Sequence, residues 1–190
     1  MSERSPQAIR AEALESLLVE QGFLSEQDVD ESIALYSERV GPMNGARVVA
    51  KAWVDPDFRA RLLTDATRAI EPFEFTGGEV QKLVVVENTP TVHNVVVCTL
   101  CSCYPWALLG LPPTWYKDPA YRSRIVREPR RVLAEFGLSV SPEQEVRVWD
   151  SSAEVRYLVL PQRPAGTGDL DEAALAERVT REAMIGVAVL

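Results

Sequence analysis

The three cysteines of the chain, Cys98, Cys101 and Cys103, all lie within six residues. An odd number of cysteines so close together cannot form the disulfide framework that holds some small folds together. They also follow directly after a run of β-branched residues, Val95–Val97, which predicts that the cysteine loop begins where a buried strand ends. The chain must therefore fold around an ordinary hydrophobic core and place three thiols in one tight loop.

The composition supplies such a core. Of the 190 residues, 46% are hydrophobic and 25% are charged, which is typical of a globular domain with an extension. The formal net charge of −8 argues against nucleic acid or an anionic membrane as a partner, because both would repel the chain. No apolar run approaches the roughly 20 residues that span a bilayer, and the first ten residues lack the apolar core of a signal peptide. Together with the clustered thiols, these features indicate a cytoplasmic protein.

Helical patterns dominate the first 70 residues. Gly22 ends a stretch with apolar residues at helical spacing, and Ser25 with Asp28 resembles a capping box at the start of the next helix. Asp55 followed by Pro56 combines an N-cap with proline at the first helical position. Helices are predicted over residues 6–21, 25–39, 46–53 and 56–70. These helices need an apolar surface to pack against.

From residue 71 onward the pattern changes to short strands and helices, with Gly77-Gly78 marking the change. Strands are predicted over residues 82–87, 95–97, 145–150 and 154–160, and helices from 118, over 129–136 and over 171–182. The last two strands are predicted to form a β-hairpin around Ser151-Ser152. The sequence thus predicts an α+β fold, with a helical N-terminal arm over residues 1–70 and a strand-and-helix domain over residues 71–190 that carries the cysteine loop.

Three thiolates in one loop make a soft, strongly donating set of metal ligands. A structural zinc site would need a fourth ligand, and roughly 17 Å of extended chain can separate His93 from the cysteines. His93 is expected to satisfy buried backbone groups instead. Cys98 and Cys101 have the spacing of a thioredoxin-like redox pair, which leaves Cys103 without a role. Three thiols that simply pack as small apolar residues would not explain the clustering, so a single metal ion is favoured and the other interpretations stay open.

The residues around the loop resemble the alpha subunit of nitrile hydratases, enzymes that add water to a nitrile to give an amide. The resemblance covers about residues 40–190 and is close over the segment VVVENTPTVHNVVVCTLCSCYPWALLGLPPTWYKDPAYRSRIVREPRRVLAEFG. Its most specific part is the Cys-Thr-Leu-Cys-Ser-Cys loop, residues 98–103, which is shared only with thiocyanate hydrolases. In that family a threonine at the position of Thr99 accompanies cobalt, and a serine accompanies iron. The resemblance therefore implies cobalt(III) as the cofactor, with iron as the less favoured metal.

In that family the loop holds one trivalent metal through three cysteine sulfurs and two deprotonated backbone amides. The resemblance implies that Cys98 provides an axial thiolate, Cys101 a sulfinate and Cys103 a sulfenate, while Ser102 and Cys103 supply the amide nitrogens. A sixth position would stay open for Lewis-acid chemistry. The Cys103 sulfenate is the favoured nucleophile, with an activated water as the alternative.

Other residues enter through the same resemblance. Trp106 and Trp115 could line an apolar pocket for the nitrile, although tryptophans beside a proline-rich loop can equally serve packing. Asp150, Glu154 and Arg156 match a charged set that supports the site indirectly in the family. Alternation along a strand puts Glu154 and Arg156 on one face, where an ordinary cross-strand salt bridge is the simpler role.

The family also implies a beta subunit as partner, which the N-terminal helices would contact, and a small nitrile as substrate. The nearest alternative is the metal-bearing subunit of a thiocyanate hydrolase, which shares the loop but not the context of Trp106 and Gly110–Pro113. A branch that hydrates cyano-nucleosides is another, since Ala107 stands where the family has proline and could widen the pocket. A metal-binding or maturation partner without catalytic activity is the third.

Overall fold

The structure, a computed structural model, describes residues 5–35, 40–75 and 82–190. The chain folds into two compact units, residues 1–38 and 39–190. No helix within the described ranges is both long enough and apolar enough to cross a membrane. The predicted change of pattern at Gly77-Gly78 lies outside the described residues.

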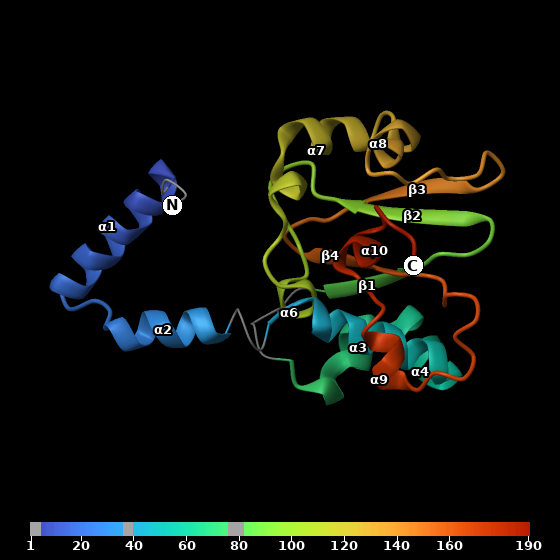
Figure 1. Ribbon diagram of the computed structural model, residues 1–190, viewed down its shortest axis with the longest axis horizontal. Helices are drawn as coiled ribbons and strands as arrows, with labels where there is room; N and C mark the ends of the chain where they lie inside the picture. Colours follow the sequence, from blue (N-terminus) through green and yellow to red (C-terminus); the bar gives the residue numbers. More distant parts are fainter. Residues whose placement is uncertain (1–4, 36–39, 76–81) are drawn as a thin grey trace. The chain divides into compact units, whose positions relative to one another are not determined.

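The smaller unit consists of two helices, α1 (Pro6–Glu20) and α2 (Glu26–Ala34) (Figure 1). Gly22 joins them with a φ of 73°, a left-handed conformation that glycine adopts at little cost. The predicted capping box is confirmed, because the Ser25 hydroxyl accepts from the Asp28 amide while the Asp28 carboxylate accepts from the Ser25 amide. Neither helix buries a residue within the described part of the chain. Residues 36–39, the end of the second predicted helix, lie outside the described residues.

The strands of the larger unit form two parallel pairs. Strand β1 (Lys82–Glu87) pairs with β4 (Val155–Leu160), and β2 (Val92–Val97) pairs with β3 (Glu145–Asp150). Five of the six residues of β2 are buried. Such a continuous buried run is typical of parallel strands that are covered on both faces.

The predicted hairpin of the last two strands is wrong, although both strands lie where they were expected. Strand β3 continues along β2 beyond its last residue, because the Ser151 amide donates to the Val97 carbonyl at 2.7 Å. The chain then crosses to the other sheet, where the Lys82 amide donates to the Glu154 carbonyl at 3.0 Å. Strands β3 and β4 therefore join different sheets. Strand β3 pairs with β2, which is more buried than β4, and β4 pairs with β1, which is more buried than β3.

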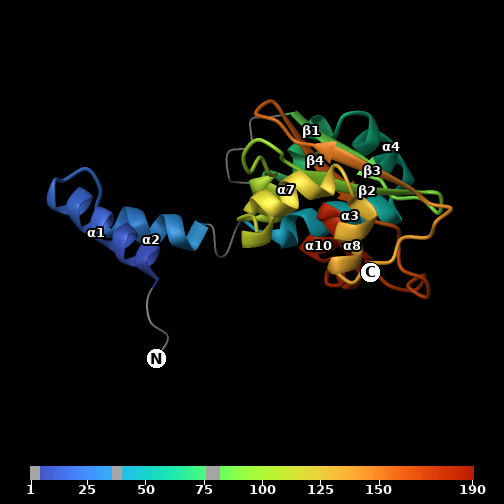
Figure 2. The ribbon, with the colours of Figure 1, turned by 90° about the horizontal axis from the view of Figure 1, so that it is seen from above.

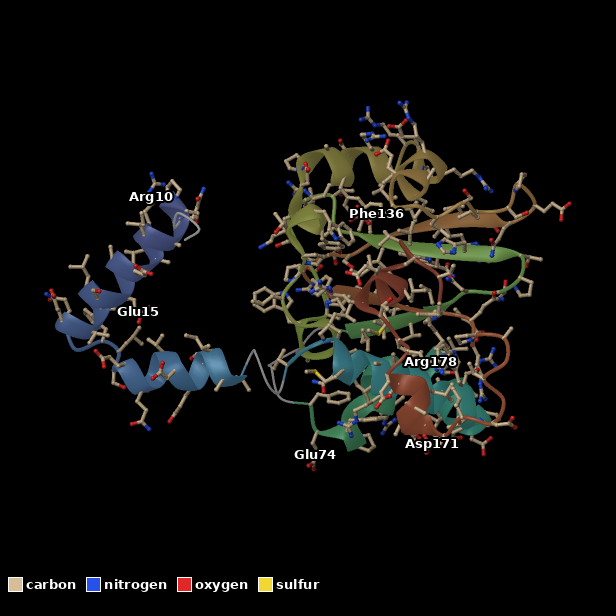
Figure 3. The ribbon with its side chains drawn as sticks, in the orientation of Figure 1. Arg10, Glu15, Glu74, Phe136, Asp171 and Arg178 are labelled. Atoms are coloured by element: carbon tan, nitrogen blue, oxygen red, sulfur yellow. The ribbon has the colours of Figure 1, made fainter. Side chains whose placement is uncertain are left out.

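Helices cover the strands on both sides (Figures 1 and 2). The helical elements of this unit are α3 (Pro42–Val54), α4 (Pro56–Thr64), α5 (Ala66–Ile70), η2 (Glu71–Phe73), α6 (Trp106–Leu109), η3 (Thr114–Lys117), α7 (Pro119–Ile125), α8 (Pro129–Glu135), α9 (Glu172–Ala176) and α10 (Arg181–Ile185). Helix α8 packs against β3, while α4 and α5 pack against β1, and α10 lies against β4 and β2. Side chains fill the space between the strands and these helices (Figure 3). The mixed helix and strand fold is therefore confirmed.

Helices α3, α4 and α5 belong to the larger unit, since the boundary between the units follows Glu38. Val48 and Val49 of α3 are fully buried in its core. The second half of the predicted 1–70 arm thus packs within the larger unit, and contact of the arm with a partner stays a prediction. Two predicted helices are also split, because the Asp65 carboxylate and the Thr180 hydroxyl each cap the start of a new helix.

A buried polar network anchors the start of β2. The Nε2 atom of His93 donates to the Gly186 carbonyl at 2.7 Å, and burial lowers the pKa of the ring. The backbone amide of Asn94 donates to the Asn88 side chain at 2.7 Å, and Trp149 Nε1 donates to the Asn94 side chain at 2.8 Å. His93 therefore satisfies a backbone carbonyl, as expected, and fixes β2 against the segment after α10.

Gly186 packs so closely against β2 that no side chain fits at its position. Its φ is 91°, and a Cβ atom would lie 2.0 Å from the Asn94 carbonyl oxygen. We expect Gly186→Ala to lower the free energy of unfolding by about 3 kcal/mol or more, since backbone must move. Gly166→Ala is the matched control, because Gly166 also has a positive φ but nothing within 4 Å of the added Cβ. It should cost only about 1–2 kcal/mol. Urea denaturation measures both, and equal losses would contradict the steric argument.

Candidate metal centre

The cysteine loop begins at the edge where β2 and β3 both end. Cys98 follows Val97 directly, and Val97 lies opposite Asp150, the last residue of β3. Loops at the carboxyl ends of parallel strands are frequent places for functional sites. The loop runs on to α6, so its predicted position between a strand and a helix is confirmed.

The three cysteine sulfurs lie close enough to surround one ion. The Sγ atoms of Cys98 and Cys101 are 3.4 Å apart, and those of Cys101 and Cys103 are 3.2 Å apart. All three sulfurs lie within 4.8 Å of one another. Cys98 is buried, Cys103 is half-buried and Cys101 is exposed, so the group lies at the surface with one sulfur on the core side.

The Cys101 and Cys103 thiols differ in acidity. Hydrogen bonds from the Cys103 and Cys98 thiols lower the pKa of Cys101 to about 7, and the backbone amides of Ser102 and Cys103 act in the same direction. Burial raises the pKa of Cys103 to about 12, and its hydrogen bonds to the other two cysteines act in the same direction. One thiolate therefore forms readily, whereas three together would repel one another unless a cation lay between them. The donor set fits a metal ion for this reason.

Backbone amides also face the sulfurs. The Cys101 amide donates to the Cys98 sulfur at 3.3 Å, and the amides of Ser102 and Cys103 point to the Cys101 sulfur. Nitrogen atoms of the loop thus lie on the same side as the three sulfurs.

The carbonyl groups of the loop point the other way, towards η3 and α7. The Arg122 guanidinium donates to the Cys101 carbonyl at 3.0 Å, and the Tyr116 hydroxyl donates to the Cys103 carbonyl at 2.9 Å. The Tyr121 hydroxyl donates to the Val96 carbonyl at 2.8 Å, just before the loop. Sequence reasoning missed these three donors, because no local pattern shows which side chain of a later helix reaches a loop.

Asp150 ties the start of the loop to β3. Its carboxylate accepts from the Thr99 amide at 2.9 Å and from the Thr99 hydroxyl at 2.6 Å. The structure thus brings together two of the residues that the resemblance had selected. Both bonds use groups that a serine would also have, so the metal preference attached to Thr99 stays a prediction.

Glu154 and Arg156 make their closest contacts with Ser152, which lies in the crossing between the sheets. The Ser152 hydroxyl donates to Glu154 at 2.9 Å, and the Arg156 guanidinium donates to the Ser152 carbonyl. The positive charge of Arg156 acts to lower the pKa of Cys103. Among the described residues, the Nε atoms of Arg156 and Arg122 are buried side-chain donors without a hydrogen-bond partner.

The two tryptophans have different environments. Trp115 packs edge-on against Tyr121 and Phe136, with ring centroids 5.0 Å and 4.8 Å away. Trp106 begins α6 and is 36% exposed. A pocket of about 370 Å³ lies next to α6, and its lining includes Pro105, Ala107, Leu108 and Arg156. Substrate contact by either tryptophan stays a prediction.

Comparison with known proteins identifies the relatives of the chain. The family model described as "Nitrile hydratase, alpha chain" matches residues 5–188. The low-molecular weight cobalt-containing nitrile hydratase subunit alpha of Rhodococcus rhodochrous is 58% identical over 182 residues, which cover 96% of this chain and 88% of that protein. The thiocyanate hydrolase subunit gamma of Thiobacillus thioparus is 44% identical over 188 residues, covering 93% and 77%. A double mutant of the Fe-type nitrile hydratase from Comamonas testosteroni Ni1 superposes with a TM-score of 0.91 at 43% identity, covering 100% and 92%.

The link between Thr99 and Asp150 predicts a graded series of variants. Asp150→Ala removes the acceptor of both hydrogen bonds, and we expect it to lower the free energy of unfolding by about 2 kcal/mol. Thr99→Val removes only the hydroxyl and should cost about 1 kcal/mol. Thr99→Ser keeps both bonds and serves as the control. Urea denaturation and amide exchange at residue 99 measure the series; an Asp150→Ala variant as stable as Thr99→Ser would show that the link contributes nothing.

Proposed function

The chain belongs to the nitrile hydratase alpha-chain family, and from that premise we propose that it carries the metal centre of an enzyme that hydrates a nitrile to the corresponding amide. The observation that carries the proposal is the cluster of three sulfurs within 4.8 Å of one another. An alternative is the role of a thiocyanate hydrolase subunit, but the relative of that name is 44% identical, against 58% for the nitrile hydratase subunit.

We propose cobalt(III) as the metal, held by the sulfurs of Cys98, Cys101 and Cys103 and by the backbone nitrogens of Ser102 and Cys103. The amides that face the sulfurs support this ligand set. A trivalent cobalt would supply a Lewis acid that polarises a nitrile or a water molecule. The name of the Rhodococcus rhodochrous relative supports cobalt, while the Fe-type structural neighbour keeps iron as the alternative.

The different exposure of the three cysteines supports different roles. Cys98 is 1% exposed, so it serves only as a ligand on the core side. Cys101 and Cys103 are accessible to oxygen, and we assign a sulfinate to Cys101 and a sulfenate to Cys103. The sulfenate oxygen of Cys103 is then the proposed nucleophile towards the nitrile carbon. Arg156 lies close enough to influence the charge of Cys103, which supports a positioning role for this arginine.

We further propose that a second subunit of the beta type is the partner of this chain. We place the complex in the cytoplasm, where reducing conditions keep the thiols available for the metal. The smaller unit supports this proposal, because its helices carry exposed apolar side chains. Ile9 and Leu17 of α1 are each 55% exposed, and Phe23, in the connection between the two helices, is 75% exposed. Apolar side chains gathered on an exposed surface normally mark a place that another element or subunit covers.

Turnover of a panel of nitriles identifies the substrate class. Ala107 is buried and borders the pocket of about 370 Å³ beside α6, so the panel should include bulky cyano-nucleosides together with small nitriles and thiocyanate. Faster turnover of thiocyanate than of every nitrile would replace the proposed function with its alternative.

Metal analysis and mass spectrometry test the ligand assignment. We expect about one cobalt per chain, since three clustered sulfurs suit a single ion. Mass spectrometry of intact peptides should show two added oxygen atoms on Cys101, as a sulfinate, one on Cys103, as a sulfenate, and none on Cys98. Iron or zinc as the dominant metal would refute the cobalt assignment, and three unmodified thiols in an active sample would refute the proposed oxidation states.

Two serine variants separate the ligand role from the nucleophile role. Cys98→Ser and Cys103→Ser should both weaken metal retention, because a serine hydroxyl is a harder and less acidic donor than a thiolate. Nitrile hydration per bound cobalt should fall by about two orders of magnitude or more in Cys103→Ser, which also loses the nucleophile. The measurement is turnover divided by cobalt content in each preparation. Near-wild-type turnover in a fully loaded Cys103→Ser sample would show that the sulfenate is dispensable.

A further inference from the structure

Arg122 contacts the peptide group between Cys101 and Ser102. Its Nη1 atom donates to the Cys101 carbonyl oxygen at 3.0 Å. The nitrogen of this same peptide group belongs to Ser102, and its amide points to the Cys101 sulfur. The guanidinium and the sulfurs therefore lie on opposite sides of a single peptide group.

This placement has an electronic consequence. A peptide group is planar and conjugated, so the oxygen and the nitrogen share electron density. When the nitrogen binds a cation in its deprotonated form, much of the negative charge resides on the carbonyl oxygen. A hydrogen bond from a guanidinium to a charged oxygen is roughly twice as strong as one between neutral groups. Arg122 would therefore bind the metal-loaded peptide group more tightly than the metal-free one.

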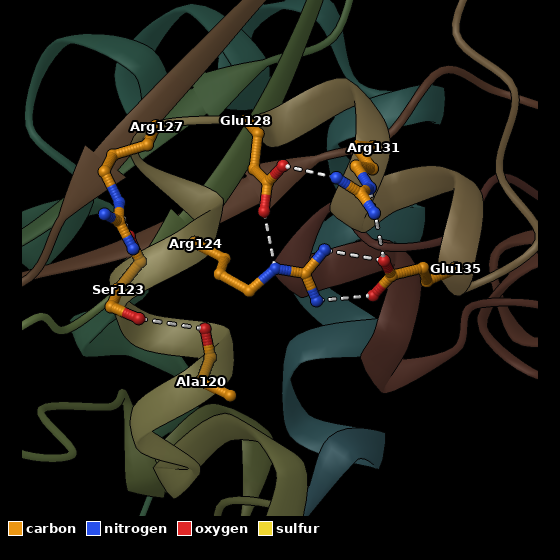
Figure 4. A network of polar contacts seen from close by, with 7 residues as sticks. All are labelled: Ala120, Ser123, Arg124, Arg127, Glu128, Arg131 and Glu135. Carbon is orange, nitrogen blue, oxygen red and sulfur yellow. Dashed lines mark hydrogen bonds and ion pairs between the residues drawn. The ribbon is translucent and has the colours of Figure 1, made fainter.

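The helix that carries Arg122 is held firmly next to the loop. Tyr121, its neighbour in α7, is buried and donates to the Val96 carbonyl at 2.8 Å. Further along α7, Arg124 bridges Glu128 and Glu135, with contacts of 2.6 Å to each carboxylate (Figure 4). This bridge links α7 to α8, so the guanidinium of Arg122 is presented from a fixed element.

We propose that Arg122 is a positioning residue for the metal centre, which stabilises the metal-binding form of the loop through the Cys101 carbonyl. The proposal rests on the function proposed above, in which Ser102 supplies a ligand nitrogen. It adds a residue outside the ligand set that acts on cobalt retention without touching the metal or the substrate.

The test compares variants of the full chain, co-expressed with the proposed partner in medium that contains cobalt. Arg122→Gln removes the charge, and Arg122→Lys keeps it with a different donor geometry. Arg127→Gln is the matched control, because Arg127 also donates to a backbone carbonyl, that of Ser123, at 2.9 Å outside the loop. The readouts are the rate of cobalt loss into excess EDTA, followed by visible absorbance and metal analysis, and the melting temperature of the metal-free complex.

We expect Arg122→Gln to lose cobalt about tenfold faster or more, which is the effect of one hydrogen bond to a charged group. Arg122→Lys should lie between this variant and the wild type, and Arg127→Gln should match the wild type. The metal-free melting temperature should differ little between Arg122→Gln and Arg127→Gln, since the effect belongs to the loaded form.

Each other outcome overturns the proposal. Cobalt loss from Arg122→Gln at the wild-type rate would show that the contact has no role at the metal centre, while the proposed function would stand. A metal-free Arg122→Gln complex that does not fold would show that Arg122 supports the fold itself. A wild-type complex that takes up no cobalt would overturn this inference together with the proposed function.

Discussion

The parallel pairing of β2 with β3 determines where the metal centre can form. It places Val97 opposite Asp150, so two strands end at the same edge and the cysteine loop starts between them. Two further contacts then depend on this register: the Ser151 amide bonds to the Val97 carbonyl, and the Asp150 carboxylate bonds twice to Thr99. A shift of one residue would turn Asp150 to the other face of its sheet and release the loop.

The amide and carbonyl groups of the cysteine loop point to opposite sides, an arrangement that regular secondary structure does not provide. Its amides face the sulfurs, while its carbonyls at Cys101 and Cys103 receive hydrogen bonds from Arg122 and Tyr116. A helix or a strand would pair the amides with other backbone groups and leave no nitrogen for a metal. The proposed ligand set therefore requires an irregular backbone, and side chains from η3 and α7 replace the missing partners of its carbonyl groups.

Sequence patterns predicted the parts of the structure that depend on neighbours in the chain. The capping box at Ser25, the strand before Cys98 and the thiol cluster are all local features, and the structure confirms them. The parallel partner of β3 could not be predicted, because alternation of apolar residues shows a buried face but not the strand that will lie beside it. The donor Arg122 was missed for the same reason, since its position on α7 becomes meaningful only when the helix packs against the loop.

The distance in sequence between Thr99 and Asp150 means that the cysteine loop is synthesised before the strand that holds it in place. These residues are 51 positions apart, so the cysteine segment leaves the ribosome well before the strand that anchors it. Contacts between such distant residues form late, because closing the intervening chain costs entropy that only the finished core repays. Until then the three thiols belong to an open chain with no fixed geometry. The nascent polypeptide consequently exposes thiols that can be oxidised, and an ion that needs all three sulfurs at once, such as the proposed cobalt, can be selected only after β3 has joined β2.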